Sequence, residues 1–175
     1  LTGADPAMGV AMASTGEVAC IGEDMHEALL MAMRSVGFVI GRRSALISTG
    51  PLMEKAQWLP VLDRLRNMGF EFYATSGTAR FMRANGFETG TLRWPLEGGR
   101  PNCIDYLKEG RIGLVINIPK NNEAEELSND YLIRRAAVDC GVPLLTNLNL
   151  ARRLVEALSF RDMDDLPVEP YRGVP

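Results

Sequence analysis

Short apolar runs alternate with amphipathic stretches along the chain from Ser44 onward. Runs with the length of buried strands lie at residues 44–50, 70–77, 112–119 and 142–147, with a weaker one at 87–92. Apolar residues at helical spacing lie at residues 58–69, 78–86, 103–110, 130–141 and 148–159. Most of the strands are apolar on both faces, as in a parallel sheet covered on each side. The pattern predicts an α/β fold, a mainly parallel five-stranded sheet with helices on both faces, in three layers.

The segment before Ser44 has a different character. Residues 1–24 carry turn-forming glycines and no periodic pattern, and from Asp24, a candidate N-cap, an apolar stripe at helical spacing runs to Gly37. The chain does not begin with Met, and we expect a piece of a longer polypeptide. We divide it into a leading piece at residues 1–40, one domain at residues 41–160, and a tail at residues 161–175 that is either mobile or packed down.

The composition, with 46% hydrophobic and 23% charged residues, is that of a soluble globular protein. No apolar run approaches the roughly 20 residues that span a bilayer, and the start lacks the features of a signal peptide, so we expect a cytoplasmic protein without membrane contact. The net charge of -3 gives no reason to expect nucleic acid as a partner. The cysteines fit neither a disulfide framework nor a zinc site, and we expect them to be buried or half-buried.

Polar residues gather where the predicted strands end, which is where ligands bind in open parallel sheets. Ser48 ends the first strand, and the segment Thr75, Ser76, Gly77 and Thr78 ends the second. The glycine allows a tight turn into a helix, the hydroxyls can donate to an anion, and the N–H groups of a helix starting near Thr78 point to the same place. The segment predicts a cradle for a carboxylate or phosphate. The alternative is that the two threonines only cap the helix.

Three residues in the neighbouring loops could complete such a cradle. Lys55 follows the first strand and Arg93 the third, and either could supply positive charge, although a lone Lys or Arg is more often a solvated surface residue. Trp94 lies in a loop rich in Gly and Pro, where it could form an apolar wall of the ligand site or a plug that fixes the loop. The sequence leaves both alternatives open.

Asn117 is an amide at the end of an otherwise apolar strand. Burying it without partners would cost about 1–3 kcal/mol, so we expect it to bond either a ligand or the backbone of a neighbouring loop. The following stretch, residues 119–130, carries Lys120 and is expected to be a long loop, flexible enough to close over a site.

No arrangement for bond-making is evident in the sequence. His26, the only histidine, lies in the leading helix, where we expect it on the surface, so neither a Ser/His/Asp nor a Cys/His arrangement can form at the strand ends. The chain has no GxxxxGK[ST] or GxGxxG loop and no paired-carboxylate motif. The sequence predicts a binding site without catalytic residues and without a metal.

Two sets of segments resemble the large subunit of carbamoyl phosphate synthetase. GADPAMGVAMASTGEVACIG followed by EALLMAM is similar to the end of its second ATP-grasp synthetase domain. LIS, GFEFYATSGTA, RWPLEGGRPN, LVINIP, YLIRRAAVD and VPLLTN resemble the methylglyoxal-synthase-like domain that ends the subunit. The resemblance implies a synthetase-domain remnant with linker at residues 1–40 and a methylglyoxal-synthase-like, Rossmann-like effector-binding domain at residues 41–160.

In that family the C-terminal domain is regulatory and binds a small anion such as UMP, IMP or N-acetylglutamate. The resemblance implies that Thr75 and Thr78 are its effector-binding threonine pair and that Asn117 is its strand-end asparagine. It also implies that Ser48 and Lys55 match positions used by nucleotide-binding members.

The resemblance leaves the effector open. Trp94 matches the tryptophan of the N-acetylglutamate-responsive type, but Lys120 and Asp130 stand where that type has further asparagines. Nucleotide-binding members use a lysine near Trp94, a role that would fall to Arg93.

The resemblance also implies a role in a larger enzyme. That enzyme would make carbamoyl phosphate for pyrimidine or arginine biosynthesis, with ATP and Mg or Mn in its full-length form and no cofactor in this piece. Its partners would be the rest of the large subunit and a glutaminase small subunit. One alternative is a lyase acting on triose phosphate, but true methylglyoxal synthases need a histidine and acidic residues whose positions are not filled here. Another is a structural or oligomerisation module with a decayed site.

Overall fold

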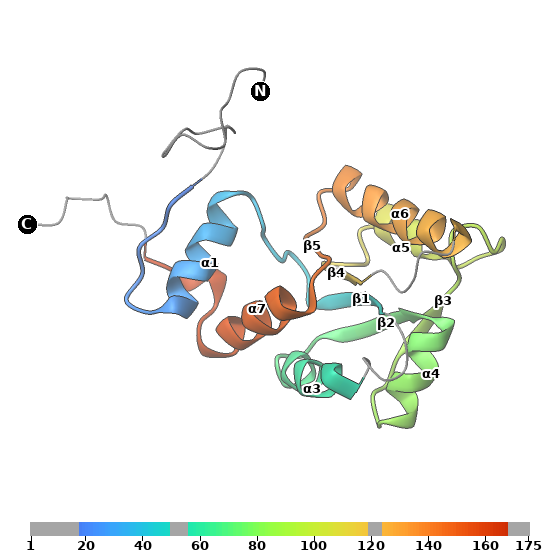
Figure 1. Ribbon diagram of the computed structural model, residues 1–175, viewed down its shortest axis with the longest axis horizontal. Coiled ribbons are helices and arrows are strands. Elements are labelled where there is room, and N and C mark those ends of the chain that lie inside the picture. Colours follow the sequence, from blue (N-terminus) through green and yellow to red (C-terminus); the bar gives the residue numbers. More distant parts are fainter. Residues whose placement is uncertain (1–17, 50–55, 119–123, 168–175) are drawn as a thin grey trace, which may run out of the picture.

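Five parallel strands form one sheet in the order β3-β2-β1-β4-β5. The computed structural model describes residues 18–49, 56–118 and 124–167 (Figure 1). The strands are β1 (Ser44–Ser48), β2 (Glu71–Thr75), β3 (Gly90–Leu92), β4 (Leu114–Asn117) and β5 (Leu144–Leu145). The predicted α/β fold is confirmed, and every strand pair in the sheet is parallel.

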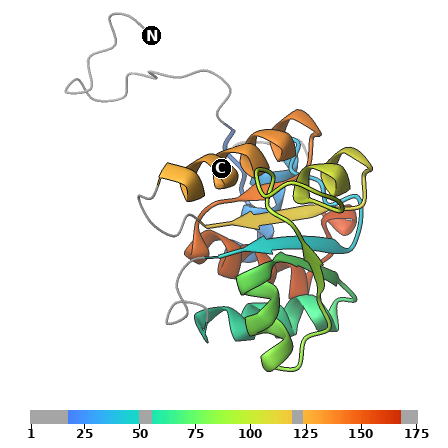
Figure 2. The same cartoon turned by 90° about the vertical axis from the view of Figure 1, so that its right-hand side faces the viewer.

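Helices cover both faces of the sheet (Figure 2). One face carries α3 (Leu59–Asn67), α4 (Ser76–Ala84) and α7 (Leu148–Phe160), and the other carries α5 (Cys103–Lys108) and α6 (Ala124–Asp139). Alternate residues of β1 serve the two cores: Ile47 packs in the cluster that contains Leu154 of α7, and Leu46 packs in the cluster that contains Ile133 of α6. This double burial explains why the strands are apolar on both faces.

The helix bounds differ from the sequence prediction in two informative places. A 3-10 turn, η1 (Ala56–Trp58), leads into α3, and Pro60 lies in the first turn of α3, where its missing N–H is tolerated. The larger difference is at α6, which begins at Ala124 instead of residue 130. The prediction of a loop as far as residue 130 is wrong, because residues 124–127, AEEL, are strong helix formers without an apolar period that would reveal them.

The leading helix, α1 (Met25–Ser35), packs against α7. Asp24 is its N-cap as predicted, with Oδ1 accepting from the Glu27 N–H at 2.8 Å, and this bond lowers the pKa of the Asp24 carboxyl. Glu27 is buried and pairs with Arg161 just beyond α7, Nη1 to Oε2 at 2.9 Å. His26 is half-buried and stacks on Phe160 at 5.0 Å between ring centroids, so the prediction of a surface histidine is wrong.

The described part of the tail, residues 161–167, packs down on the domain. It contains the 3-10 turn η2 (Met163–Asp165), and Met163 and Leu166 are buried. The Met163 carbonyl accepts from Arg34 Nη1 at 2.7 Å, which ties the tail to α1. The division into residues 1–40, 41–160 and 161–175 stays a prediction, and residues 1–17 and 168–175 lie outside the described ranges.

No helix within the described ranges is long and apolar enough to cross a membrane.

The three cysteines differ in their exposure to solvent. Cys103 is buried and Cys20 half-buried, as expected, but Cys140 is exposed. That prediction is wrong for Cys140 because it follows the last turn of α6, where the chain leaves the helix on the solvent side.

Candidate functional site

Hydroxyl and amide side chains from three strands meet at the carboxyl edge of the sheet. β1 and β4 are neighbours, and Ser48 lies opposite Asn117 in their register. On the other side of β1, Thr75 Oγ1 at the end of β2 donates to Ser48 Oγ at 3.4 Å. The chain leaves β1 toward β2 on one side and reaches β4 on the other, so this point is the topological switch of the sheet. The fold thus brings Ser48, Thr75 and Asn117 together, as the sequence predicts.

The hydroxyl cluster is defined as Ser48, Thr49, Thr75 and Thr78. All four residues are buried, with exposed fractions of 0–2%. The second contact in the cluster runs from the Thr49 N–H to Thr78 Oγ1 at 3.4 Å. Both hydrogen bonds are long, and each hydroxyl has a rotatable donor and two acceptor lone pairs. The cluster therefore keeps capacity to bond a ligand that enters between β1 and α4.

The start of α4 supplies N–H groups to the same place. Thr75 is the N-cap residue by position, but its side chain makes no capping hydrogen bond, and Thr78 lies inside the first turn. The alternative in which the two threonines merely cap the helix is therefore wrong. Ser76 and Gly77, both exposed, carry N–H groups that have no carbonyl partner within the helix. Together with the helix dipole, these groups favour an anion at this end.

Gly77 has a different role from the one expected. We expected it to allow a tight strand-to-helix turn, but α4 begins at Ser76, and Gly77 is helical, with no positive φ. The turn is made at Thr75, whose extended backbone has φ -66° and ψ 154°.

Asn117 is fully buried and held by two side chains of α6. Its Nδ2 donates to Asp130 Oδ1 at 2.7 Å, and its Oδ1 accepts from Arg134 Nη1 at 2.8 Å. Because a carboxylate only accepts and a guanidinium only donates, the pair fixes the orientation of the amide. We expected Asn117 to bond a ligand or the backbone of a neighbouring loop. That expectation is wrong, because the partners of both its amide atoms are side chains of α6. The partners are four residues apart, on one face of α6, a helix whose start the sequence analysis placed too late.

The loop after β3 is fastened to itself and to α6. Arg93 is exposed, and its Nη1 donates to the Gly98 carbonyl at 3.3 Å within the loop. Gly99 has φ +79°, a backbone conformation that favours glycine at this position of the loop. The Leu96 N–H donates to Asn129 Oδ1 at 2.9 Å, next to Asp130. The role of Arg93 as a ligand cation stays a prediction.

Trp94 is half-buried and packs against the core between the sheet and α5–α6. This packing agrees with the alternative in which Trp94 fixes the loop, and the residue as a whole stays partly exposed. Lys55 and Lys120, the two lysines predicted to contribute, lie outside the described residues.

The described residues offer neither a metal cluster nor a reactive thiol at this edge. Within residues 18–49, 56–118 and 124–167, no three His, Cys, Asp or Glu side chains are grouped to hold a metal ion. Burial, with smaller effects from the carboxylates of Asp130 and Glu97, raises the pKa of the Cys103 thiol to about 12. Cys103 is therefore protonated at neutral pH and is a weak nucleophile.

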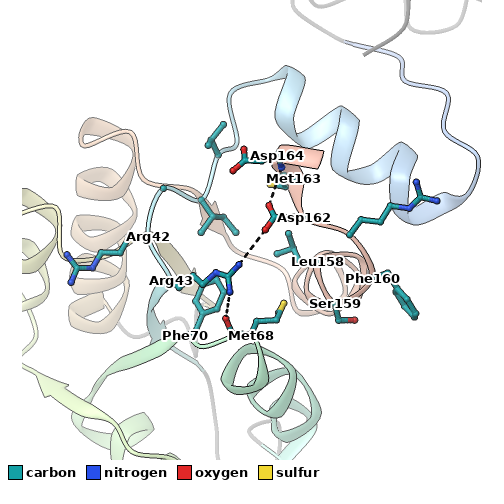
Figure 3. A pocket seen from close by; sticks show the side chains of 14 residues that line it. Arg42, Arg43, Met68, Phe70, Leu158, Ser159, Phe160, Asp162, Met163 and Asp164 are labelled. Atoms are coloured by element: carbon teal, nitrogen blue, oxygen red, sulfur yellow. Dashed lines mark hydrogen bonds and ion pairs between the residues drawn. The ribbon is translucent and has the colours of Figure 1, made fainter. Parts of the chain in front are cut away.

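The cavity drawn in Figure 3 lies away from the hydroxyl cluster. This cavity of about 410 Å³ lies at the opposite, amino edge of the sheet, between residues 39–43, the α3–β2 turn and the end of α7 (Figure 3). Arg43 crosses it, with Nη1 on the Met68 carbonyl at 2.9 Å and Nη2 at 3.4 Å from Asp162 Oδ2. An ion pair this exposed contributes little to stability.

The parallel sheet with helices on both faces places the protein in the three-layer α/β class. Within that class, the family model described as the MGS-like domain matches residues 57–146. The chain belongs to the MGS-like domain family.

Relatives extend the match over most of the chain. It is 43% identical over 168 residues to the multifunctional protein pyrABCN of Emericella nidulans, covering 91% of this chain. It is 38% identical over 177 residues to the mitochondrial carbamoyl-phosphate synthase [ammonia] of Homo sapiens, covering 98%. It is 40% identical over 172 residues to the multifunctional protein CAD of Squalus acanthias, covering 90%. The resemblance to carbamoyl phosphate synthetase is confirmed, although the chain spans only 7%, 12% and 8% of these proteins.

The bonds of Asn117 lead to a stability prediction. Replacing Asn117 with Ala leaves the buried Asp130 carboxylate and Arg134 without their amide partner, and we expect the unfolding free energy to fall by about 2–3 kcal/mol. The measurement is urea unfolding. The matched control is Asn85→Ala, which removes an exposed amide that donates to the Phe81 carbonyl and should cost below about 1 kcal/mol. Equal losses for the two variants would contradict the assigned role of Asn117.

The cysteines lead to a labelling prediction. At pH 8 we expect the folded chain to react quickly with a thiol reagent at Cys140, which is exposed, and not at Cys103, whose pKa is raised and whose side chain is buried. In urea all three thiols should react. Peptide mapping by mass spectrometry separates the sites, and rapid labelling of Cys103 in the folded protein would show that its burial is wrongly assigned.

Proposed function

We propose that this chain is the effector-binding, regulatory domain of a carbamoyl phosphate synthetase large subunit and that its effector binds at the hydroxyl cluster. The observation that carries the proposal is the cluster itself: its four hydroxyl-bearing residues and the first N–H groups of α4 lie together at the topological switch of the sheet. Membership of the MGS-like domain family supports the same reading.

The α4 side of the site suits the anionic end of the effector. Thr75 and Thr78 contribute hydroxyls, and Ser76 and Gly77 contribute exposed N–H groups at the positive end of the helix dipole. None of these groups carries a full charge, so an additional cation would strengthen the binding of a phosphate or carboxylate. Lys55, Lys120 and Arg93 remain the candidates for that cation.

The β4 side of the site suits a neutral, hydrogen-bonding part of the effector. Among the described residues of this side, the Asp130 carboxylate and the Arg134 guanidinium flank Asn117, and their formal charges cancel, so these two residues add no net positive charge for a second anionic group. An effector with one phosphate and a neutral ring fits this distribution better than a dicarboxylate does. We therefore place a nucleoside monophosphate ahead of N-acetylglutamate.

The larger enzyme is part of the proposal. It would make carbamoyl phosphate in pyrimidine or arginine biosynthesis, with ATP and Mg or Mn bound in its synthetase domains and a glutaminase small subunit as partner. Two of the relatives are multifunctional proteins and one is a mitochondrial carbamoyl-phosphate synthase, which supports a place within a longer polypeptide. A cytoplasmic location is also proposed on the sequence alone.

The proposal predicts the effect of removing one hydroxyl. Thr75→Val keeps the size of the side chain and removes the donor, and we expect it to weaken effector binding about 10- to 100-fold, as for a lost hydrogen bond to a charged group. The measurement is titration calorimetry with UMP, IMP and N-acetylglutamate. The matched control is Thr91→Val on β3, whose exposed hydroxyl contacts Arg83 and should leave binding unchanged.

Three results would oppose the proposal. If none of the three compounds binds, the site has no regulatory ligand of the expected kind in this domain. If binding survives Thr75→Val but fails with Thr91→Val, the site lies elsewhere. Formation of methylglyoxal from dihydroxyacetone phosphate by the purified chain would favour the lyase alternative.

A further inference from the structure

A second polar hollow lies on the outer side of the helices α3 and α7. Its volume is about 410 Å³, and the described residues that line it are Arg64, Asn149, Arg152, Arg153 and Glu156. It is separate from the hydroxyl cluster, with which it shares no residue, and neither the family match nor the relatives' names assign it a role.

The packing of the two helices fixes the hollow. On α7 the lining residues recur at spacings of three and four, so they form one stripe along the helix. Two of the arginines are each followed in the sequence by a fully buried leucine. Leu65 follows Arg64, Leu154 follows Arg153, and both leucines lie in one core. The arginine backbones are therefore held in place even though their side chains are exposed.

The hollow carries an excess of positive charge in a chain whose net charge is -3. Three guanidinium groups face one carboxylate, and Glu156 is already paired with Arg153 at 3.0 Å. Among residues 18–49, 56–118 and 124–167, neither Arg64 nor Arg152 forms an ion pair or a side-chain hydrogen bond. Two guanidinium groups thus share one hollow without a counter-ion from the described chain, and an anion between them would relieve their repulsion.

The lining also specifies the chemistry of the anion. Guanidinium groups bind phosphate and carboxylate oxygens through paired hydrogen bonds, and groups from two helices favour an anion with several charged oxygens. None of the described residues that line the hollow is aromatic or aliphatic, so none of them can stack on a nucleobase as an aromatic ring would. We propose that Arg64 and Arg152, with Asn149, form a second anion site for a multiply charged phosphate-type oxyanion.

This proposal does not depend on the proposed function, and one titration separates the two. The probe is inorganic pyrophosphate, titrated calorimetrically into the whole chain at low salt. We expect saturable binding that Arg152→Glu weakens at least 10-fold. The matched control is Arg135→Glu, the same charge reversal at an exposed arginine of α6 on the other face of the sheet, and it should change binding less than 2-fold.

Arg64→Glu tests the site independently, because Arg64 lies on α3 and Arg152 on α7. Thr75→Val tests whether the pyrophosphate binds at the hydroxyl cluster. Loss of binding in Arg64→Glu and Arg152→Glu, with Thr75→Val unchanged, would support the second site. The proposal is overturned by absence of saturable binding or by equal losses in Arg152→Glu and Arg135→Glu. It is also overturned by a loss confined to Thr75→Val, which would place the pyrophosphate at the strand ends. Circular dichroism confirms that each variant is folded.

Discussion

The strand order around β1 is the constraint on which the site depends. Because the chain runs from β1 to β2 on one side and β4 joins β1 on the other, the carboxyl ends of three strands meet at the point where the strand order reverses. Ser48 and Asn117 face each other across that point, and Thr75 joins them from β2. These polar side chains can be buried there because each has a partner, and the buried aliphatic residues behind them keep their positions fixed.

The two sides of the site are built by different physical means. On the side of α4, the described residues offer neutral hydroxyls and N–H groups, which favour negative charge without any ionised side chain. On the side of β4, a carboxylate and a guanidinium from one helix lock an amide by donor and acceptor complementarity. The lock also joins α6 to the sheet, and Asn129 extends the connection to the loop that carries Trp94. On the side of β4, Asn117 and the loop that carries Trp94 are therefore both fastened to α6.

The sequence predicted the sheet and the gathering of polar residues at its carboxyl edge, for identifiable reasons. The strands are apolar on both faces, and polar residues at their ends are visible without a structure, which is why Ser48, Thr75, Thr78 and Asn117 could be chosen correctly as neighbours. The partners of Asn117 could not be found in the same way. Asp130 and Arg134 face the sheet only because α6 starts at Ala124, and residues 124–127 lack the apolar period that would have shown this. Trp94 could not be assigned from sequence, because a wall and a plug have the same residue type and the same flanking glycines.

The central claim is that a small anion binds between the hydroxyl cluster and the start of α4. The most direct measurement is the set of amide chemical-shift changes in the 19.2 kDa chain, labelled with nitrogen-15, during titration with UMP. The account predicts changes at Thr49, Ser76 and Gly77 and in the side-chain amide of Asn117, and none at Phe70 on the amino edge of the sheet. Changes confined to the amino edge, or no changes with UMP, IMP or N-acetylglutamate, would contradict it.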